Sequence, residues 1–435
     1  MRLDQVQLSS IGAVFWVFLF YVFIFQPPVF PKLAYLVLQV FFVVMLMVFS
    51  FRRVNSFVSA FKVELVLVLF VVFYAFFRDS VSGEIVYADR FLGWCFQGFI
   101  VSGVLISFYF SRRGEFINSE YFAQEIYLSV VIASVFTFIL FFVPSFDSFY
   151  ESIQLDGYYE RYSSFEYRYR AYGIAENLTF TYSFVLGLCA GYSLILSRRS
   201  WLYLFFVPLF IFGVSVNARV GFLGFVLFVF YIVARGGVIA KLLVFISFLV
   251  IAAWLSFFSN NFLQENAWAL GFFLDISNFL VYGFSGDNIF ATLVNDHFVI
   301  PSSLLDLLFG SGKSIYVGAE QASDVGYILQ LNYGGFLLLV LLFFLVLFMS
   351  MRLFKVLGFR HWYSWFFPVS ILLLNFKGFI FAMTPGGRFL VLLYIFFIFR
   401  ELMMKRRQFV AGCLYQPLAV DQPHPSTDSA KVNNV

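Results

Sequence analysis

The sequence has 435 residues, of which 62% are hydrophobic and 12% are charged, and its formal net charge at pH 7 is +4. Soluble proteins average roughly 45–50% hydrophobic and about 25% charged residues, so this chain has too little charge to cover a water-soluble surface. The composition also excludes a disordered chain, a collagen and a coiled coil, and it predicts a protein that lies almost wholly in a membrane.

Apolar segments long enough to cross a bilayer recur along the whole chain. A hydrocarbon core of about 30 Å needs about 17–25 residues of helix, so the sequence predicts an all-α polytopic membrane protein with about twelve transmembrane helices. In chain order they are expected near residues 9–26, 33–50, 58–77, 91–110, 123–143, 177–196, 201–216, 220–234, 240–258, 326–350, 362–383 and 388–400. They form one transmembrane domain, residues 1–407, and the polar residues 408–435 are expected to be a disordered cytoplasmic tail.

The distribution of basic residues predicts the orientation in the membrane. If the N-terminus is inside, the inner segments hold 18 of the 28 Lys and Arg residues and leave 10 outside. Because short cytoplasmic loops carry an excess of Lys and Arg, both termini are expected on the cytoplasmic side. Two connections on the outer side are enlarged, residues 144–176 and 259–325, and the other connections are short.

The first enlarged loop ends in a basic and aromatic segment. Arg168 and Arg170 stand close together in the sequence, and Tyr172, Glu176 and Asn177 follow before the next predicted helix. The two arginines are either an ordinary surface cluster or cations presented at the mouth of a site. Their place on the outer side, where the short loops hold few cations, keeps the second interpretation open.

A hydrophilic turn around residues 215–221 separates two apolar segments and carries Asn217 and Arg219. Arg219 is expected at or slightly below the outer membrane surface, where an arginine is costly. It either extends its side chain to the lipid headgroups or binds a phosphate through its planar guanidinium.

The second enlarged loop contains two apolar stretches, 268–284 and 299–309, that are too short to span the membrane. We expect them to lie at the membrane surface as helices. Ser302 and Ser303 precede Leu304 in the manner of a helix start, where a hydroxyl caps the first backbone N–H groups.

Four residues in or just after this loop are candidates for catalysis or substrate binding: His297, Lys313, Asp324 and Tyr327. His297 is either a polar surface residue or a general base. Lys313 lies in a Gly-Lys-Ser stretch that imitates the end of a nucleotide-binding P-loop, but Leu307 stands where that motif needs its first glycine. We therefore discount nucleotide binding, and no His, Cys or carboxylate cluster in the sequence has the spacing of a zinc site.

Two further cations lie near the last outer turn. Lys377 falls inside the eleventh apolar segment, where a lysine either extends to the surface or has a function, and Arg388 follows that turn. The outer cations together predict an outward-facing cavity that suits a pyrophosphate on a lipid carrier: Arg168, Arg170, Arg219, Lys313, Lys377 and Arg388.

With these residues in view, the chain resembles the O-antigen polymerase (Wzy) family, within the wider group that also holds O-antigen ligases. The resemblance covers most of the chain, and it is carried by the following segments: 170–177, 217–221, 310–312, 323–327 and 334–335. The chain departs from the family in one respect. Members often have a further arginine early in the second loop, whereas residues 259–300 here contain no Arg or Lys.

The resemblance implies a glycosyltransferase of the bacterial inner membrane. Its reaction transfers a growing glycan from undecaprenyl pyrophosphate onto a lipid-linked repeat unit at the periplasmic face. Arg170 and Arg219 are expected to stabilise the leaving pyrophosphate, and Asp324 to accept the proton of the acceptor hydroxyl, with Glu176 and His297 as the next candidates. The expected substrate-binding residues are Arg168, Tyr172, Glu176, Asn177, Asn217, Lys313, Tyr327, Lys377 and Arg388.

The expected partners are the undecaprenyl-pyrophosphate-linked oligosaccharide, the lipid bilayer, a chain-length regulator and a flippase. No metal ion, cofactor or nucleic acid is expected. Two other functions stay open: an O-antigen ligase, which shares nearly every feature, and a flippase or transporter of lipid-linked sugars. Transporters usually place charges at the midplane of several helices, whereas the ionisable residues here gather towards one face, which favours chemistry at that face.

Overall fold

The computed structural model describes most of the chain between residues 10 and 414. The described residues are 10–27, 32–114, 119–153, 174–175, 180–218, 220–239, 241–249, 278, 281–283, 297–313, 315, 323 and 325–414. Every regular element among them is a helix, which confirms the all-α fold predicted from the sequence.

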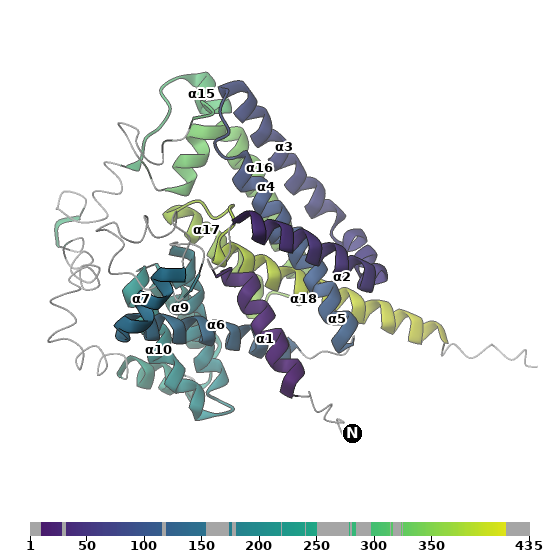
Figure 1. Cartoon of the computed structure of the whole chain (residues 1–435), viewed down its shortest axis with the longest axis vertical. Helices are drawn as coiled ribbons and strands as arrows, with labels where there is room; N and C mark the ends of the chain where they lie inside the picture. The colour runs from purple at the N-terminus through teal and green to yellow at the C-terminus, as the bar shows by residue number, and fades with distance from the viewer. Residues whose placement is uncertain are drawn as a thin grey trace, which may run out of the picture.

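The helices form the bundle in Figure 1. In chain order they are α1 (Ser10–Phe25), α2 (Lys32–Ala60), α3 (Lys62–Ser82), α4 (Ala88–Gly93), the π-helix η1 (Trp94–Val101), α5 (Ser102–Arg113), α6 (Ser119–Phe142), α7 (Pro144–Ile153), α9 (Phe180–Leu196), the 3₁₀-helix η2 (Trp201–Phe205), α10 (Phe206–Asn217), α11 (Gly221–Arg235), α15 (Leu304–Phe309), α16 (Gly326–Leu357), α17 (Trp362–Lys377) and α18 (Pro385–Leu414). Within the described ranges, 5 helical segments are long and apolar enough to cross a membrane: α2, α3, the continuous α4–η1–α5, α6 and α16. Shorter apolar helices accompany them, in α1, α9, η2 with α10, and α11.

Several helices begin or end elsewhere than the apolar pattern predicts. α2 continues past residue 50 to Ala60 and bends at Ser50, whose φ of −130° and ψ of 24° are not helical. α17 ends at Lys377, and residues 378–384 form an irregular connection where the sequence predicts a helix to 383. α18 begins at Pro385, which suits a first helical turn because no partner is needed there for the proline nitrogen. It continues to Leu414, past the predicted start of the tail at 408.

The helix start predicted before Leu304 is confirmed, although the helix covers only part of the apolar stretch 299–309. α15 begins at Leu304, and the Oγ of Ser303 caps it by accepting a hydrogen bond from the backbone N–H of Asp306 at 3.0 Å. Most of the other apolar stretch, 268–284, lies outside the described residues.

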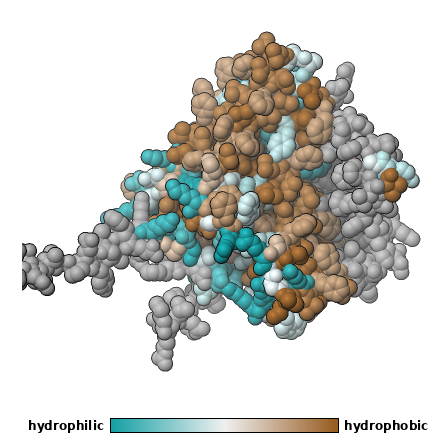
Figure 2. Space-filling view, turned by 180° about the vertical axis from the view of Figure 1, so that it is seen from behind, coloured by the Kyte–Doolittle hydropathy of each residue, from teal (hydrophilic) through white to brown (hydrophobic). Residues whose placement is uncertain are grey.

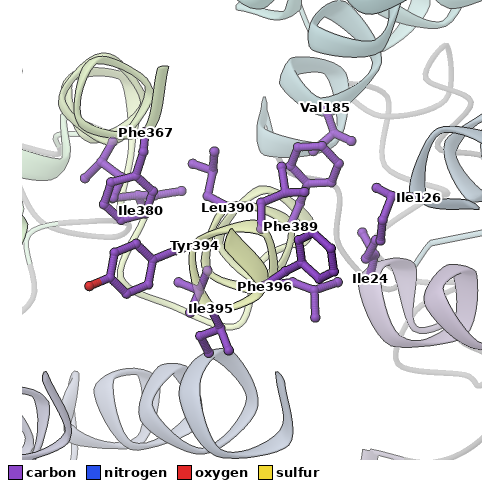
Figure 3. Close-up of a cluster of buried hydrophobic side chains, with 14 of the residues drawn as sticks. Ile24, Ile126, Val185, Phe367, Ile380, Phe389, Leu390, Tyr394, Ile395 and Phe396 are labelled. Carbon is purple, nitrogen blue, oxygen red and sulfur yellow. The ribbon is translucent and has the colours of Figure 1, made fainter. Parts of the chain in front are cut away.

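α18 lies at the centre of the core. Its side chains point to several sides, and Leu390, Tyr394 and Phe396 are at most 2% exposed. The side chains around them come from α1, α6, α9 and α17, as Figure 3 shows: Ile24, Ile126, Val185 and Phe367. One central helix therefore connects the first and the last parts of the bundle.

The perimeter of the bundle is apolar. Phe41 and Val48 on α2 and Phe73 on α3 are 62%, 69% and 71% exposed. Figure 2 shows mainly hydrophobic surface over the upper part of one face, with hydrophilic residues gathered in the lower part. Large exposed apolar areas are unusual on soluble monomers, and they suit contact with the hydrocarbon of a bilayer.

α9 and α11 approach each other at backbone distance through glycines. A Cβ atom at Gly187 would stand 1.8 Å from the carbonyl oxygen of Gly221, and one at Gly224 would stand 2.7 Å from that of Phe184. Small residues permit such contacts between membrane helices. This packing holds the turn between α10 and α11 beside the first turns of α9.

Candidate functional site

The predicted site residues that are described belong to one end of the bundle, which we call the outer end because the sequence predicts that this end faces outwards. It consists of the last turns of α3, α10 and α17, the first turns of α9, α11, α16 and α18, and the segments that join them. The described site residues are Asn217, His297, Lys313, Tyr327, Lys377 and Arg388. The other predicted site residues lie outside the described part of the chain: Arg168, Arg170, Tyr172, Glu176, Asn177, Arg219 and Asp324.

The Gly310-Ser311-Gly312 segment docks on a kink in α16. Gly335 has a φ of 66° and a ψ of −171°, which interrupts the helix. The carbonyl oxygens of Asn332 and Tyr333, just before the kink, accept hydrogen bonds from the backbone N–H groups of Ser311 (2.7 Å) and Gly312 (2.9 Å). The backbone N–H groups of this segment thus donate to helix carbonyl oxygens, whereas those of a P-loop would donate to a phosphate.

Glycine is required at the first position of this segment. Gly310 has a φ of 80° and a ψ of 164°, a backbone region that is almost confined to glycine. A Cβ atom there would stand 2.1 Å from the carbonyl oxygen of Tyr333. Lys313 follows with an exposed side chain, and its backbone N–H donates to the Oγ of Ser311 at 3.2 Å.

Two buried charged residues of α3 complete this docking, and sequence reasoning missed both. Arg78 donates from Nη2 to the carbonyl oxygen of Gly310. Asp79 accepts a hydrogen bond of 2.6 Å from the Tyr333 hydroxyl, and its other oxygen accepts from the backbone N–H groups of Val86 and Ala88, both at 3.0 Å. Arg78 and Asp79 are 8% and 4% exposed, so they join α3, α4 and α16 in the interior.

His297 lies beside the start of α16. Its carbonyl oxygen accepts a hydrogen bond of 2.8 Å from the Oγ of Ser323, which also accepts one of 3.2 Å from the backbone N–H of Val325. Two residues further on, the carbonyl oxygen of Val299 accepts from Nδ2 of Asn332 at 2.7 Å. The structure therefore brings the His297 segment to the residues that flank the predicted base at position 324.

The start of α16 packs on the end of α17. A Cβ atom at Gly326 would stand 2.4 Å from the carbonyl oxygen of Gly378, and the Tyr327 hydroxyl donates to the carbonyl oxygen of Leu372 at 3.0 Å. One turn deeper, Gln330 and Asn375 exchange amide hydrogen bonds of 2.7 and 3.0 Å. Tyr327 is thereby held beside the last turn of α17.

Lys377 is the last residue of α17, and its side chain is exposed. The next residue, Gly378, packs on α9, because a Cβ atom there would stand 2.3 Å from the Phe180 ring. The start of α18 meets the same helix, since a Cβ atom at Gly386 would stand 2.7 Å from Cβ of Thr181. Lys377 thus lies at the rim of the outer end, close to where α9 begins.

The turn between α10 and α11 is anchored to α9 as well. The backbone N–H of Ala218 donates to the Oγ of Ser183 at 2.9 Å. Asn217 is fully buried, and its Nδ2 donates to the carbonyl oxygen of Gly213 at 2.7 Å. The described part of this turn therefore lies next to the helix that also meets Gly378 and Gly386.

The end of the first enlarged loop reaches α1. The Tyr21 hydroxyl donates to the carbonyl oxygen of Ile174 at 3.1 Å, and Ala175 is fully buried. Ile174 and Ala175 are the described residues closest in sequence to Arg170 and Glu176, which the sequence predicts as site residues.

Arg388 is buried behind the rim, with 1% of its surface exposed. Its Nε donates to the carbonyl oxygen of Ile24 at 2.9 Å, and its Nη1 donates to Oε1 of Gln97 at 3.0 Å. Gln97 lies in the π-helix η1 and also accepts from Gln26 at 3.2 Å. In these contacts Arg388 joins α1, η1 and α18.

The outer end thus joins segments that are far apart in the sequence. Contacts run from His297 to Ser323, from Gly326 to Gly378, and from Gly378 through α9 to Ala218. Among the described residues, no group of three or more His, Cys, Asp or Glu side chains is suited to hold a metal ion.

Comparisons with protein-family models, with curated proteins and with solved structures find no significant match to this chain.

Proposed function

We propose that the protein is an inner-membrane polymerase of a bacterial surface polysaccharide. It transfers a growing glycan from undecaprenyl pyrophosphate onto a lipid-linked repeat unit. In this proposal the chain crosses the membrane about twelve times, with both termini in the cytoplasm, and the loops 144–176 and 259–325 lie in the periplasm. A chain-length regulator and a flippase act beside it.

One observation carries the proposal. The segments of the family resemblance that are described meet at a single end of the bundle: 310–312 docks on 332–335, and 325–327 packs on the end of α17. The end of α17 contacts α9, which in turn holds Ala218. Residues 217–221 and 310–312 lie about a hundred positions apart in the sequence, and a shared site would explain why both lie at this end.

The proposed reaction needs a leaving-group site and a base. The acceptor hydroxyl oxygen forms the new glycosidic bond to the anomeric carbon while the bond from that carbon to the pyrophosphate oxygen breaks. Arg170 and Arg219 stabilise the charge that develops on the pyrophosphate. Asp324 accepts the hydroxyl proton, with Glu176 and His297 as alternatives.

The surface glycan of a strain that lacks the protein tests this function. A polymerase predicts a ladder reduced to a single repeat unit on the lipid A core, because the ligase still attaches unpolymerised units. A strain that attaches no repeat unit at all would contradict the polymerase and indicate a ligase or a flippase. Restoring the wild-type gene to the deletion strain must return the long ladder.

A further inference from the structure

A cavity opens at the opposite end of the bundle, between the start of α6, the ends of α9 and α11 and the start of α17. Its volume is about 330 Å³. The polar and aromatic residues that line it include Glu120, Arg198, Arg199, Arg235, His361 and Trp362. We call this cavity the basic cleft, and none of these residues belongs to the proposed glycan site.

The basic cleft carries an excess of positive charge. Arg199 forms an ion pair with Glu120, the one carboxylate among the described residues of the lining. Arg198 and Arg235 are exposed and form no ion pair with any described residue. A guanidinium presents a planar set of donors that matches a phosphate, so the pair suits an anionic phosphate group.

The inner wall of the cleft is apolar, and it borders a narrow crevice of only about 40 Å³ in the bundle. Tyr192, Trp362 and Phe397 line both spaces, and deeper walls come from Leu188 and Phe228. A soluble phosphate would gain nothing from such a wall, whereas an acyl chain would bury apolar surface there.

The level of the cleft in the bilayer follows from the residues that come after Arg199. Trp201, Leu202 and Phe205 of η2 are 65%, 55% and 65% exposed. Exposed tryptophan beside apolar residues is typical of the interface between headgroups and hydrocarbon. Basic pockets between helices at this level are typical sites for anionic lipid headgroups.

We propose that the basic cleft binds an anionic phospholipid, with Arg198 and Arg235 on its phosphate and an acyl chain against Trp362 and Phe397. The lipid joins the ends of α9 and α11 to the start of α17, so its binding stabilises the bundle at this end. The proposal is independent of the glycan chemistry.

Thermal unfolding of the full-length protein in a non-ionic detergent tests the site. Phosphatidylglycerol is expected to raise Tm in a saturable manner, and phosphatidylcholine at the same mole fraction is not. The double variant Arg198→Gln/Arg235→Gln should need at least about tenfold more phosphatidylglycerol for half of the rise, because two charge-assisted contacts are lost. Arg52→Gln is the control, since Arg52 is exposed on α2 and does not line the cleft.

Three results would overturn the proposal: equal effects of the two lipids, an unchanged midpoint in the double variant, or the full rise with inorganic phosphate alone. The last would identify a soluble phosphate as the ligand.

A second measurement does not depend on the stability of the arginine variants. Phosphatidylglycerol with brominated acyl chains should quench tryptophan fluorescence more than brominated phosphatidylcholine does. This excess should disappear in Trp362→Phe, because Trp362 lines both the cleft and the crevice. Excess quenching that persists in the variant would place the lipid elsewhere.

Discussion

Arg219 is the residue on which the proposed chemistry depends most. A charge-assisted hydrogen bond is worth roughly 1.5–3 kcal/mol, so Arg219→Ala should slow polymerisation by about ten- to 150-fold while the protein still inserts. Arg219→Lys keeps the charge but loses the planar donor set, and only partial activity is expected. The length distribution of the surface glycan, at equal protein levels, measures both effects.

Arg52→Ala is the matched control for this experiment, because it removes an exposed arginine of α2 that does not belong to the proposed site. It should leave the glycan unchanged. A normal ladder in Arg219→Ala would refute the role of Arg219. Full activity of Asp324→Asn would transfer the proposed base to Glu176 or His297.

His361 predicts a pH dependence of stability. It caps α17 through Nδ1, which accepts a hydrogen bond of 3.3 Å from the backbone N–H of Tyr363. Burial, and then the positive charge of Arg400, lower the pKa of His361 from 6.5 to about 4. Between these values the unfolded protein binds a proton that the folded protein does not, so this contribution to stability is present above pH 6.5 and is lost as the pH falls towards 4.

The variant His361→Asn keeps a capping oxygen but does not titrate. Between pH 7.5 and pH 5, the Tm of the wild type should therefore fall further than that of the variant. Equal decreases in Tm would show that His361 does not contribute to the pH dependence.

Arg388 and Arg78 show why site residues are hard to place from sequence. Both stand near the outer end of a helix, where an arginine is expected to face the surface. Arg388 is instead 1% exposed, in contact with a carbonyl of α1 and with Gln97, and Arg78 contacts Gly310, 232 positions away in the chain. The face of a helix on which such a residue lies depends on packing between distant segments, which periodicity in a uniformly apolar helix does not reveal.

At the scale of the elements, a single substitution should disrupt the docking of residues 310–312 on α16. Gly310→Ala introduces a side chain in a backbone region that excludes it and places Cβ 2.1 Å from the Tyr333 carbonyl oxygen. The segment must then leave the kink, and we expect a loss of stability of at least about 3 kcal/mol. Thermal unfolding in detergent measures this loss.

Gly83→Ala separates the two causes of strain. Gly83 has a φ of 78°, but nothing lies within 4 Å of the Cβ position. It should therefore cost only about 1 kcal/mol, from the left-handed backbone alone. Equal losses of Tm in Gly83→Ala and Gly310→Ala would argue against a steric role of the α16 kink.

Local signals in the sequence predicted the elements better than their ends. The serine before Leu304 caps α15 as expected, because capping is a local interaction. α17 ends earlier than predicted, because the hydropathy stays high where the helix stops. The chain leaves the helix at Gly378 and turns towards α9. The extension of α2 crosses residues 51–57, which lie between two predicted apolar segments, and hydropathy has no signal for it. It also takes residues 58–60 from the start of the next predicted helix.

For the whole molecule, the orientation in the membrane can be tested with reporter fusions. Short basic turns set the orientation, so fusions at Tyr158 and Ala322 should report the periplasm and a fusion at Arg199 should report the cytoplasm. A cytoplasmic signal at Ala322 would reverse the proposed sidedness and remove the site from the periplasmic face.

The most direct test of the account uses purified protein in detergent with lipid-linked repeat units as the only substrate. We predict that the glycan lengthens and undecaprenyl pyrophosphate is released. The bond energy is already present in the lipid pyrophosphate, so no ATP or nucleotide sugar is required. In the proposed site arginines take the place of a metal ion at the leaving group, so a chelator should not change the rate. The polymerase would be contradicted if the repeat units stay single. If the same preparation also moves labelled lipid across a vesicle membrane, the protein is a transporter.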